Sequence, residues 1–175
     1  MSALRETFIS ELQDIYDAEH QIVKALPDLI DAATHDELKT GLQEHLEETR
    51  GHIKRVEQVF QIFSETPKRK KCKGTAGLLE EGKEVIGDAL GDAALIAAAQ
   101  KVEHYEIASY GSLSAWARLL KKDDAVELLD ANLNEEKQAD ENLTDVAENA
   151  INSEENDSDE QEEMSVKSNR QKRSS

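Results

Sequence analysis

Several kinds of residue are scarce in this 175-residue chain, and each shortage excludes something. Its one cysteine, Cys72, excludes an internal disulfide framework and a metal site built from several cysteines. Aromatic residues make up 4% of the chain, which is lean for a β-sandwich but normal for helices packed through Leu, Ile, Val and Ala. Only 2 prolines and 8 glycines leave room for long uninterrupted elements.

Positive charge is scarce as well, because 21 Lys and Arg face 38 Asp and Glu, for a net charge of −17. A nucleic-acid binder needs a basic face, and docking on anionic lipid needs clustered Lys and Arg. No apolar run approaches the ~18 residues of a membrane span. The first residues show no signal-peptide pattern. We therefore expect a soluble, cytoplasmic protein without nucleic-acid or membrane partners.

What the chain does contain is four long stretches with apolar residues at helical spacing. They cover residues 3–26, 38–63, 93–120 and 123–150. Pro27 fits badly inside a helix, so we expect it to end the first helix, with a short helical piece over residues 29–34. No segment alternates with period two over a useful length, so no strand is expected.

The long connection lies between residues 64 and 88, where Pro67 and a basic loop over residues 68–74 precede a short apolar helix. Short connections elsewhere predict an all-α, antiparallel four-helix bundle with one long crossover connection, the ferritin-like arrangement. We assign residues 1–150 to this domain. Residues 151–175 form a charged tail that is too poor in apolar side chains to fold, so it is predicted to be disordered.

Metal-binding side chains interrupt the apolar stripes near the middle of all four helices. They are Glu19 in the first, His45, Glu48 and His52 in the second, Glu103 and Glu106 in the third, and Glu136 and Asp140 in the fourth. A buried, unpaired carboxylate costs several kcal/mol, roughly, and cations can replace its lost hydration. Any one glutamate in such a stripe is usually a boundary residue, but acids on several helices favour a shared site. Oxygen ligands with some imidazole suit Fe or Mn.

The spacing departs from that of the usual di-iron bundle. Such bundles take a Glu from each of two helices and Glu-x-x-His from each of the other two. Here Gly51 stands three residues after Glu48, and Ala139 three after Glu136. The predicted site is therefore richer in carboxylate and poorer in imidazole, with Glu48 and Glu136 as the expected bridging ligands.

Five runs of sequence carry a resemblance to a known family. The longest is AAAQKVEHYEIASYG at 97–111. The others are DIYDAE at 14–19, HLEET with IKRV at 45–56, KCKG with GLLEEG at 71–82, and LNEEK at 133–137. Together they resemble the YciE/YciF family of ferritin-like bacterial stress proteins over residues 3–150.

The resemblance implies a rubrerythrin-like fold, a dimer and a role in stress, but no settled activity. By likeness to rubrerythrin sites, Glu19, Glu48, Glu103, Glu106 and Glu136 map onto metal-ligand positions. Two hypotheses follow. In the first, the protein holds a di-metal centre, Fe or Mn, which binds metal or reacts with peroxide or O₂. In the second, it is a non-catalytic, metal-free homodimer whose core acids are protonated or linked by water. The sequence leaves open whether the protein is an enzyme.

Overall fold

Helices account for nearly all the described chain. The computed structural model describes residues 2–88 and 91–151, and across them it contains five α-helices and no strand. They are α1 (Ala3–Ala32), α2 (Asp36–Ile62), α3 (Lys73–Gly87), α4 (Asp92–Leu119) and α5 (Asp123–Val146), with a π turn at Ala147–Ile151. The all-helical prediction is confirmed. From residue 152 onward, the tail predicted to be disordered lies outside the described residues.

The prediction that Pro27 ends the first helix is wrong, because α1 continues through it to Ala32. A proline inside a helix removes one backbone hydrogen bond and costs about 3 kcal/mol. The residues beyond it offset this cost, since Leu29, Ile30 and Ala32 pack against a buried apolar cluster. The expected separate piece over residues 29–34 is therefore the last part of α1.

Local signals set the other helix ends. Ser2 caps α1 by accepting a hydrogen bond from the backbone N–H of Arg5 at 3.3 Å. The residues after α2 and α4 include Ser64 and Lys121, each with a φ of 57°, the left-handed conformation that commonly ends a helix. The start of α4 is tied to the α1–α2 turn, because buried Asp92 accepts hydrogen bonds from the backbone N–H groups of Thr34 and His35.

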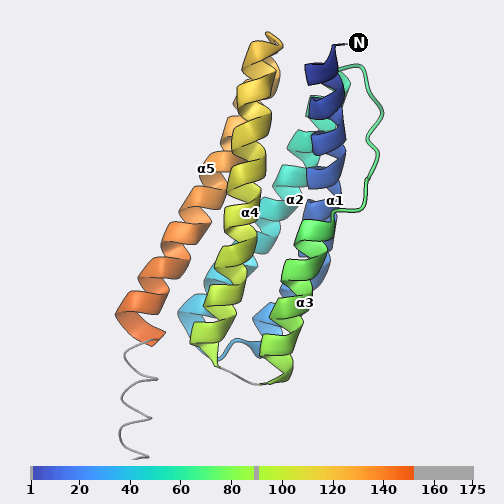
Figure 1. The fold of residues 1–175 in the computed structure, drawn as a ribbon. Helices are drawn as coiled ribbons and strands as arrows, with labels where there is room; N and C mark the ends of the chain where they lie inside the picture. Colours follow the sequence, from blue (N-terminus) through green and yellow to red (C-terminus); the bar gives the residue numbers. More distant parts are fainter. Residues whose placement is uncertain (1, 89–90, 152–175) are drawn as a thin grey trace, which may run out of the picture.

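The four long helices lie side by side, and neighbours run in opposite directions (Figure 1). α1 packs against α2 and α4, while α5 packs against the same two helices from the other side. The link between α2 and α4 returns along the whole length of α1, so α2 and α4 both begin at the same end (Figure 1). This is the long connection that the sequence predicts.

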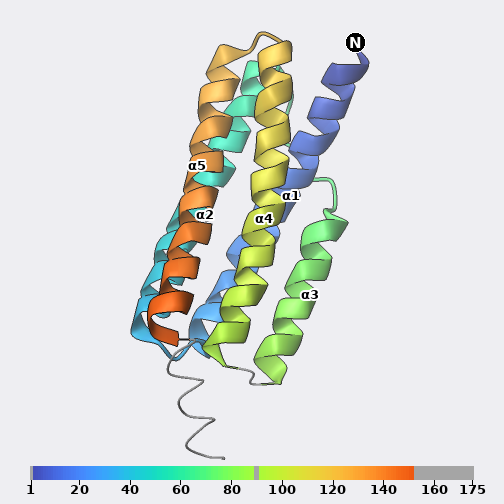
Figure 2. The same ribbon diagram turned by 60° about the vertical axis from the view of Figure 1, so that its left-hand side comes forward.

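α3 lies outside the four long helices, against α1 and α4 (Figure 2). The exposed basic segment that leads into it is fastened to α1, where Arg69 pairs with Asp17 at 2.7 Å. Cys72 is fully buried at the start of α3, and its sulfur accepts a hydrogen bond from the backbone N–H of Thr75. Cys72 thus packs as a small buried residue and also caps α3.

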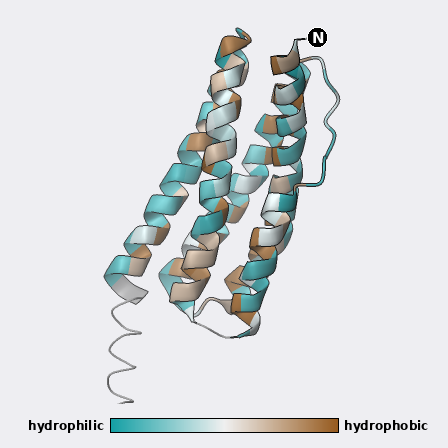
Figure 3. Ribbon diagram, in the orientation of Figure 1, coloured by the Kyte–Doolittle hydropathy of each residue, from teal (hydrophilic) through white to brown (hydrophobic). Residues whose placement is uncertain are grey.

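The apolar core is divided into two clusters along the helix axes. One contains Phe8, Leu12, Phe60 and Leu113, toward the α4–α5 turn, and the other contains Ile22, Leu42, Ile96 and Leu143, toward the opposite end. Apolar and polar residues are mixed along the same helices, as amphipathic helices require (Figure 3). Between the two clusters each long helix turns polar side chains inward.

Candidate metal centre

A band of buried polar residues separates the two apolar clusters at the middle of the four long helices. On α2 the inward positions are His45, Thr49 and His52, spaced by four and then three residues, so they share one helix face. Glu103 and Glu106 are likewise three residues apart on α4. Glu19 on α1 and Glu136 on α5 complete the band. The helical period that builds the apolar stripes thus brings these six acids and histidines together.

Burial of these side chains is nearly complete. Glu19, Glu106, Glu136 and His52 are 0% exposed, Glu103 is 3% exposed and His45 is 5% exposed. Removing a carboxylate from water costs several kcal/mol, roughly, unless hydrogen bonds or cations compensate it. Four such groups in one place also repel one another. The cluster is therefore costly to the fold unless something positive occupies it.

The potential ligand atoms fall into two groups that share one residue. The first group is His45, Glu103, Glu106 and Glu136, and the second is Glu19, His52 and Glu136. Within each group, one nitrogen or oxygen atom from every residue lies within 4.8 Å of the others. Glu136 belongs to both groups, so its carboxylate is within reach of an ion in either one. The arrangement has the form of a two-ion site.

The cluster satisfies few of its own hydrogen-bonding groups, and this tests whether it fits metal ions. Among the described residues, neither oxygen of Glu106 and neither ring nitrogen of His45 makes a hydrogen bond of normal geometry, while Glu136 is approached by Nδ1 of His52 at 2.8 Å. Buried polar atoms are normally paired, and orphaned ones cost about 1–3 kcal/mol each. Lone pairs on carboxylate and imidazole are the donors that Fe and Mn accept. The residues therefore fit a pair of such ions.

The charge balance agrees with this fit. The four carboxylates of the two groups carry four negative charges when ionised, and two divalent cations carry four positive charges. Without cations the cluster favours protonation instead. Burial raises the pKa of Glu106 well above its ordinary value, and the nearby Glu136 and Glu19 raise it further. Burial also raises the pKa of Glu103, against the opposing effect of His45.

The histidines respond to the same carboxylates. Burial acts to lower the pKa of His52, but its contacts with Glu136 and Glu19 prevail and raise the pKa to about 11. Nδ1 of His52 lies 2.8 Å from Glu136 and 3.4 Å from Glu19. Nε2 of His45 lies 3.3 Å from Glu103. Protons on these imidazoles occupy the places that cations would take, so metal binding must release protons.

A second layer of side chains orients the ligands. Nε2 of His52 lies 2.8 Å from Glu135, which is also paired with Arg55. This leaves Nδ1 of His52 facing the cluster, and a carboxylate behind a histidine is the usual support of a metal-bound imidazole. On the other side, the buried hydroxyl of Tyr110 donates a hydrogen bond to Glu19. Tyr110 thus holds the carboxylate of Glu19 in place from outside the two groups.

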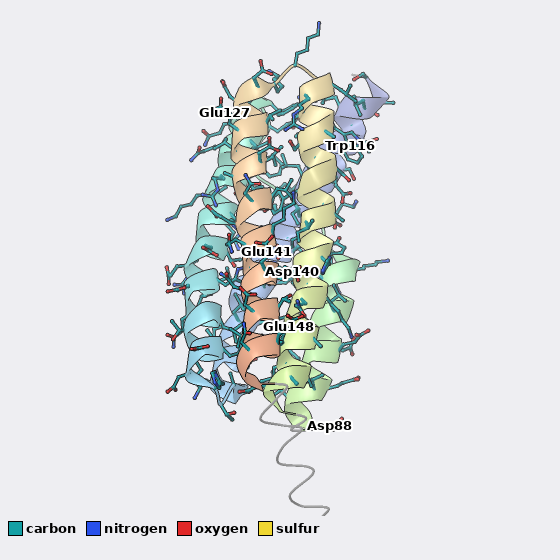
Figure 4. All side chains as sticks on the ribbon, turned by 90° about the vertical axis from the view of Figure 1, so that its left-hand side faces the viewer. Asp88, Trp116, Glu127, Asp140, Glu141 and Glu148 are labelled. Carbon is teal, nitrogen blue, oxygen red and sulfur yellow. The ribbon has the colours of Figure 1, made fainter. Side chains whose placement is uncertain are left out.

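Most of the residues singled out in the sequence converge, but two do not. Glu48 has a 45% exposed side chain and lies 3.7 Å from the outer nitrogen of His45, outside both ligand groups. Asp140 lies at the surface between α4 and α5, where it meets Gln100 and His104 (Figure 4). The exposed His104 fits its expected place beside the site. The structure therefore does not bring Glu48 into the predicted bridging position.

Sequence reasoning missed the layer behind His52. Glu135 lies on the flank of α5, and only its neighbour Glu136 falls on the buried stripe. The salient signal is the spacing of Arg55 three residues after His52, which places a guanidinium beside the imidazole. That spacing cannot reveal which residue of α5 it meets, because the answer depends on how α2 and α5 pack.

Comparison with known proteins yields consistent matches. A family model described as a domain of unknown function, DUF892, matches residues 3–156. Protein YciF of Escherichia coli (strain K12) is 46% identical over 157 residues, which are 87% of this chain and 95% of YciF. The family match spans all five helices.

Solved structures give the same result. The crystal structure of the E. coli stress protein YciF has a TM-score of 0.82 at 46% identity and covers 85% of this chain and 97% of that one. YcfI from Rhodopseudomonas palustris has a TM-score of 0.79 at 46% identity, covering 82% and 94% of the two chains. A protein from Xanthomonas campestris pv. campestris, with a TM-score of 0.66 at 22% identity, covers 84% and 92% and shares the fold alone.

Proposed function

Because this chain belongs to the DUF892 family, and to the YciE/YciF family whose motifs it carries, we propose that it is a ferritin-like stress protein with a di-metal centre. The four long helices correspond to a rubrerythrin-like four-helix bundle, with the link through α3 as its crossover connection. The centre holds two ions of Fe or Mn. E. coli YciF is itself described as a stress protein.

The observation that carries this proposal is the set of unpaired, buried donor atoms at the shared face of the helices. Four glutamates and two histidines equal in number the ligands of a di-iron carboxylate bundle. Their origin differs, because both histidines come from α2, two turns apart, in place of one from each of two helices. His45 and His52 thus supply the two imidazoles that the usual motif would place at positions 51 and 139, where this chain has Gly51 and Ala139.

Each ligand has a defined task in this arrangement. One ion would be held by Glu103, Glu106 and His45 and the other by Glu19 and His52, with Glu136 available to both. Tyr110 and Glu135 hold Glu19 and His52 in orientation. The apolar clusters on either side exclude bulk water. When bound, Fe or Mn would supply redox chemistry toward peroxide or O₂, or be held without turnover.

The test is metal content at equilibrium. We expect protein dialysed against Fe(II) or Mn(II) without air to bind two equivalents per chain by elemental analysis and calorimetry. Glu103→Gln should lower that number, whereas the exposed Glu141→Gln on α5 should leave it at two. Unchanged stoichiometry in Glu103→Gln refutes its assignment as a ligand. Wild-type protein that stays metal-free, with no change in thermal stability, supports the non-catalytic homodimer instead.

No α-helix in residues 2–88 and 91–151 is both long and apolar enough to cross a membrane.

A further inference from the structure

A hollow between α2 and α5 leads from the surface to the cluster. Its lining comes from α2 residues 37–48, α5 residues 139–146, and Glu103 of α4. The outer part is formed by exposed Glu37, Glu44 and Glu48, and the inner part by buried His45 and Glu103. The hollow has a volume of about 60 Å³, which is sufficient for water or a hydrated cation that sheds part of its shell.

The hollow opens into a shallower depression that is also acidic. The two share Glu37, Gly41 and Glu44, and the outer one adds Asp36 and Asp145. No lysine or arginine lines either of them among the described residues. A recess whose charges all have one sign concentrates the opposite sign and raises association rates by about 10- to 1,000-fold. The charge pattern therefore selects for cations.

Buried, unpaired side chains at the inner end indicate what the hollow leads to. His45 is 5% exposed, and its ring nitrogens make no hydrogen bond of normal geometry with the described residues, lying 3.3 Å from Glu103 and 3.7 Å from Glu48. Glu103 is 3% exposed, with one oxygen similarly unpaired. Both residues belong to the first ligand group. We propose that the α2–α5 hollow is the route by which divalent cations reach the metal centre, with Glu48 passing them to His45 and Glu103.

This assignment rests on the proposed function, and it explains the position of Glu48. Its carboxylate is 45% exposed yet lies 3.7 Å from Nδ1 of His45, so it contacts solvent and cluster at once. A permanent ligand is expected to be buried like Glu106. An acid at the boundary instead binds a cation in transit, replacing some of its water before the inner ligands complete the exchange.

A second hollow also reaches Glu103, but its chemistry is different. It lies between α1, α3 and α4, and its walls include Ile22, Leu78, Leu79 and Val102. Asp28 and Lys83 also line it, so its charges are of both signs and do not concentrate cations as the acidic hollow does. The α2–α5 hollow also has apolar walls, among them Leu42 and Leu143, but it adds three exposed acids and His45 that can replace water around an ion. The second hollow offers a cation no acid besides Asp28 and Glu103, so the desolvation cost there is higher. The acidic hollow is therefore favoured for cations over this one.

Gly41 offers a way to block the route without removing an acid. It lines both depressions, and a Cβ added there meets no described atom within 4 Å. Gly41→Leu should project a side chain into the route. Because leucine favours a helix over glycine by about 0.5–1 kcal/mol, the variant should fold at least as well as wild type. Gly77→Leu on α3 is the matched control, since Gly77 is exposed, helical and equally free of contacts.

Glu44→Lys tests the charge of the route in the same way. Its control is Glu127→Lys. Glu127 is an exposed acid near the start of α5, at the end of that helix away from the hollow (Figure 4). We would follow Co(II) binding to metal-free protein by stopped-flow absorbance and measure final stoichiometry after long incubation. Gly41→Leu and Glu44→Lys should each slow loading about tenfold or more and leave the final stoichiometry at two. Both controls should load at the wild-type rate.

The possible results separate the two proposals. If wild type and both variants reach two equivalents at the same rate, the route is wrong and the metal centre stands. If Glu44→Lys lowers the final stoichiometry without slowing loading, Glu44 is itself part of the metal centre, and the proposed route is again overturned. If wild type binds no Co(II), the metal centre fails and the route fails with it. Rising salt should slow wild type more than Glu44→Lys, since it screens the attraction that the variant has lost.

Discussion

A buried carboxylate kept for metal binding should destabilise the metal-free protein, and Glu106 is the residue that tests this. It is 0% exposed, and neither oxygen has a hydrogen-bond partner among the described residues. Glu106→Met keeps an unbranched side chain of similar length and removes both polar atoms. We expect the metal-free variant to be more stable than metal-free wild type.

The size of the effect follows from the two orphaned oxygens. A buried polar atom without a partner costs about 1–3 kcal/mol, and replacing buried charged groups with apolar ones of similar volume gains about 1–4 kcal/mol. Protonated Glu106 can share its proton with Glu19, which reduces the cost. The free energy of unfolding should therefore rise by about 1–4 kcal/mol in Glu106→Met.

The effect should also depend on pH, with a defined sign. The pKa of Glu106 in the folded protein lies well above its ordinary value of 4.5. Proton binding therefore stabilises the folded state fully below pH ~4.5, and this contribution is lost as pH rises toward the folded pKa. Methionine does not titrate. The stability advantage of Glu106→Met should grow as pH increases from 5 to 8.

The assay is urea unfolding in EDTA and again with excess Mn(II). Wild type should gain about 2.7 kcal/mol for each ion bound when free Mn(II) is 100 times its dissociation constant, whereas Glu106→Met should gain much less. Glu141→Met, at an exposed site on α5, is the control and should change stability by less than about 0.5 kcal/mol. A Glu106→Met protein that is less stable than wild type in EDTA would refute the reasoning.

Three further substitutions test the surroundings of the site. Glu135→Ala should weaken Mn(II) binding about 10- to 100-fold in calorimetry, because His52 loses the carboxylate behind Nε2; unchanged affinity would contradict that role. Asp17→Asn should lower the free energy of unfolding by about 1–3 kcal/mol at pH 7. Burial opposes ionisation of Asp17, but its hydrogen bonds lower its pKa below the ordinary 3.8. Its stabilisation is therefore lost as pH falls through the folded pKa, and wild type and variant should converge once Asp17 is protonated in the folded protein; a difference that persists there would be inconsistent with this reasoning. Gly74→Ala should lower the free energy of unfolding by about 1–3 kcal/mol, because the added Cβ would lie 2.6 Å from the ring of Tyr105. Equal urea midpoints for variant and wild type would show that the ring can move aside without cost.

The sequence predicted the helices well because their apolar periodicity is strong. Leu12, Tyr16 and Val56 fall on apolar stripes whose spacing of three and four residues fits a helix and not a strand, and all three are buried. Pro27 was misread because helix propensity is local, whereas the packing of Leu29 and Ile30 that carries α1 past it is tertiary. The long connection was recognised from its broken pattern.

The candidate site was predicted less completely. Glu19, Glu103, Glu106 and Glu136 were found because an acid in an apolar stripe is conspicuous. Glu48 was expected inside, yet it lies on the flank of the stripe that runs from His45 to His52, about 60° around the helix from His45. A small rotation of α2 would exchange these roles. Sequence spacing fixes relative positions on one helix but leaves that rotation undetermined.

By itself, the sequence determined that the chain would form long amphipathic helices and that each would carry polar ligands near its middle. These properties depend on neighbours three or four residues apart, which periodicity records directly. Only the tertiary structure decided which of these side chains lie together, which acid borders solvent, and which residue contacts Nε2 of His52. Those outcomes depend on the rotation and offset of one helix against another, and packing of the whole core sets both.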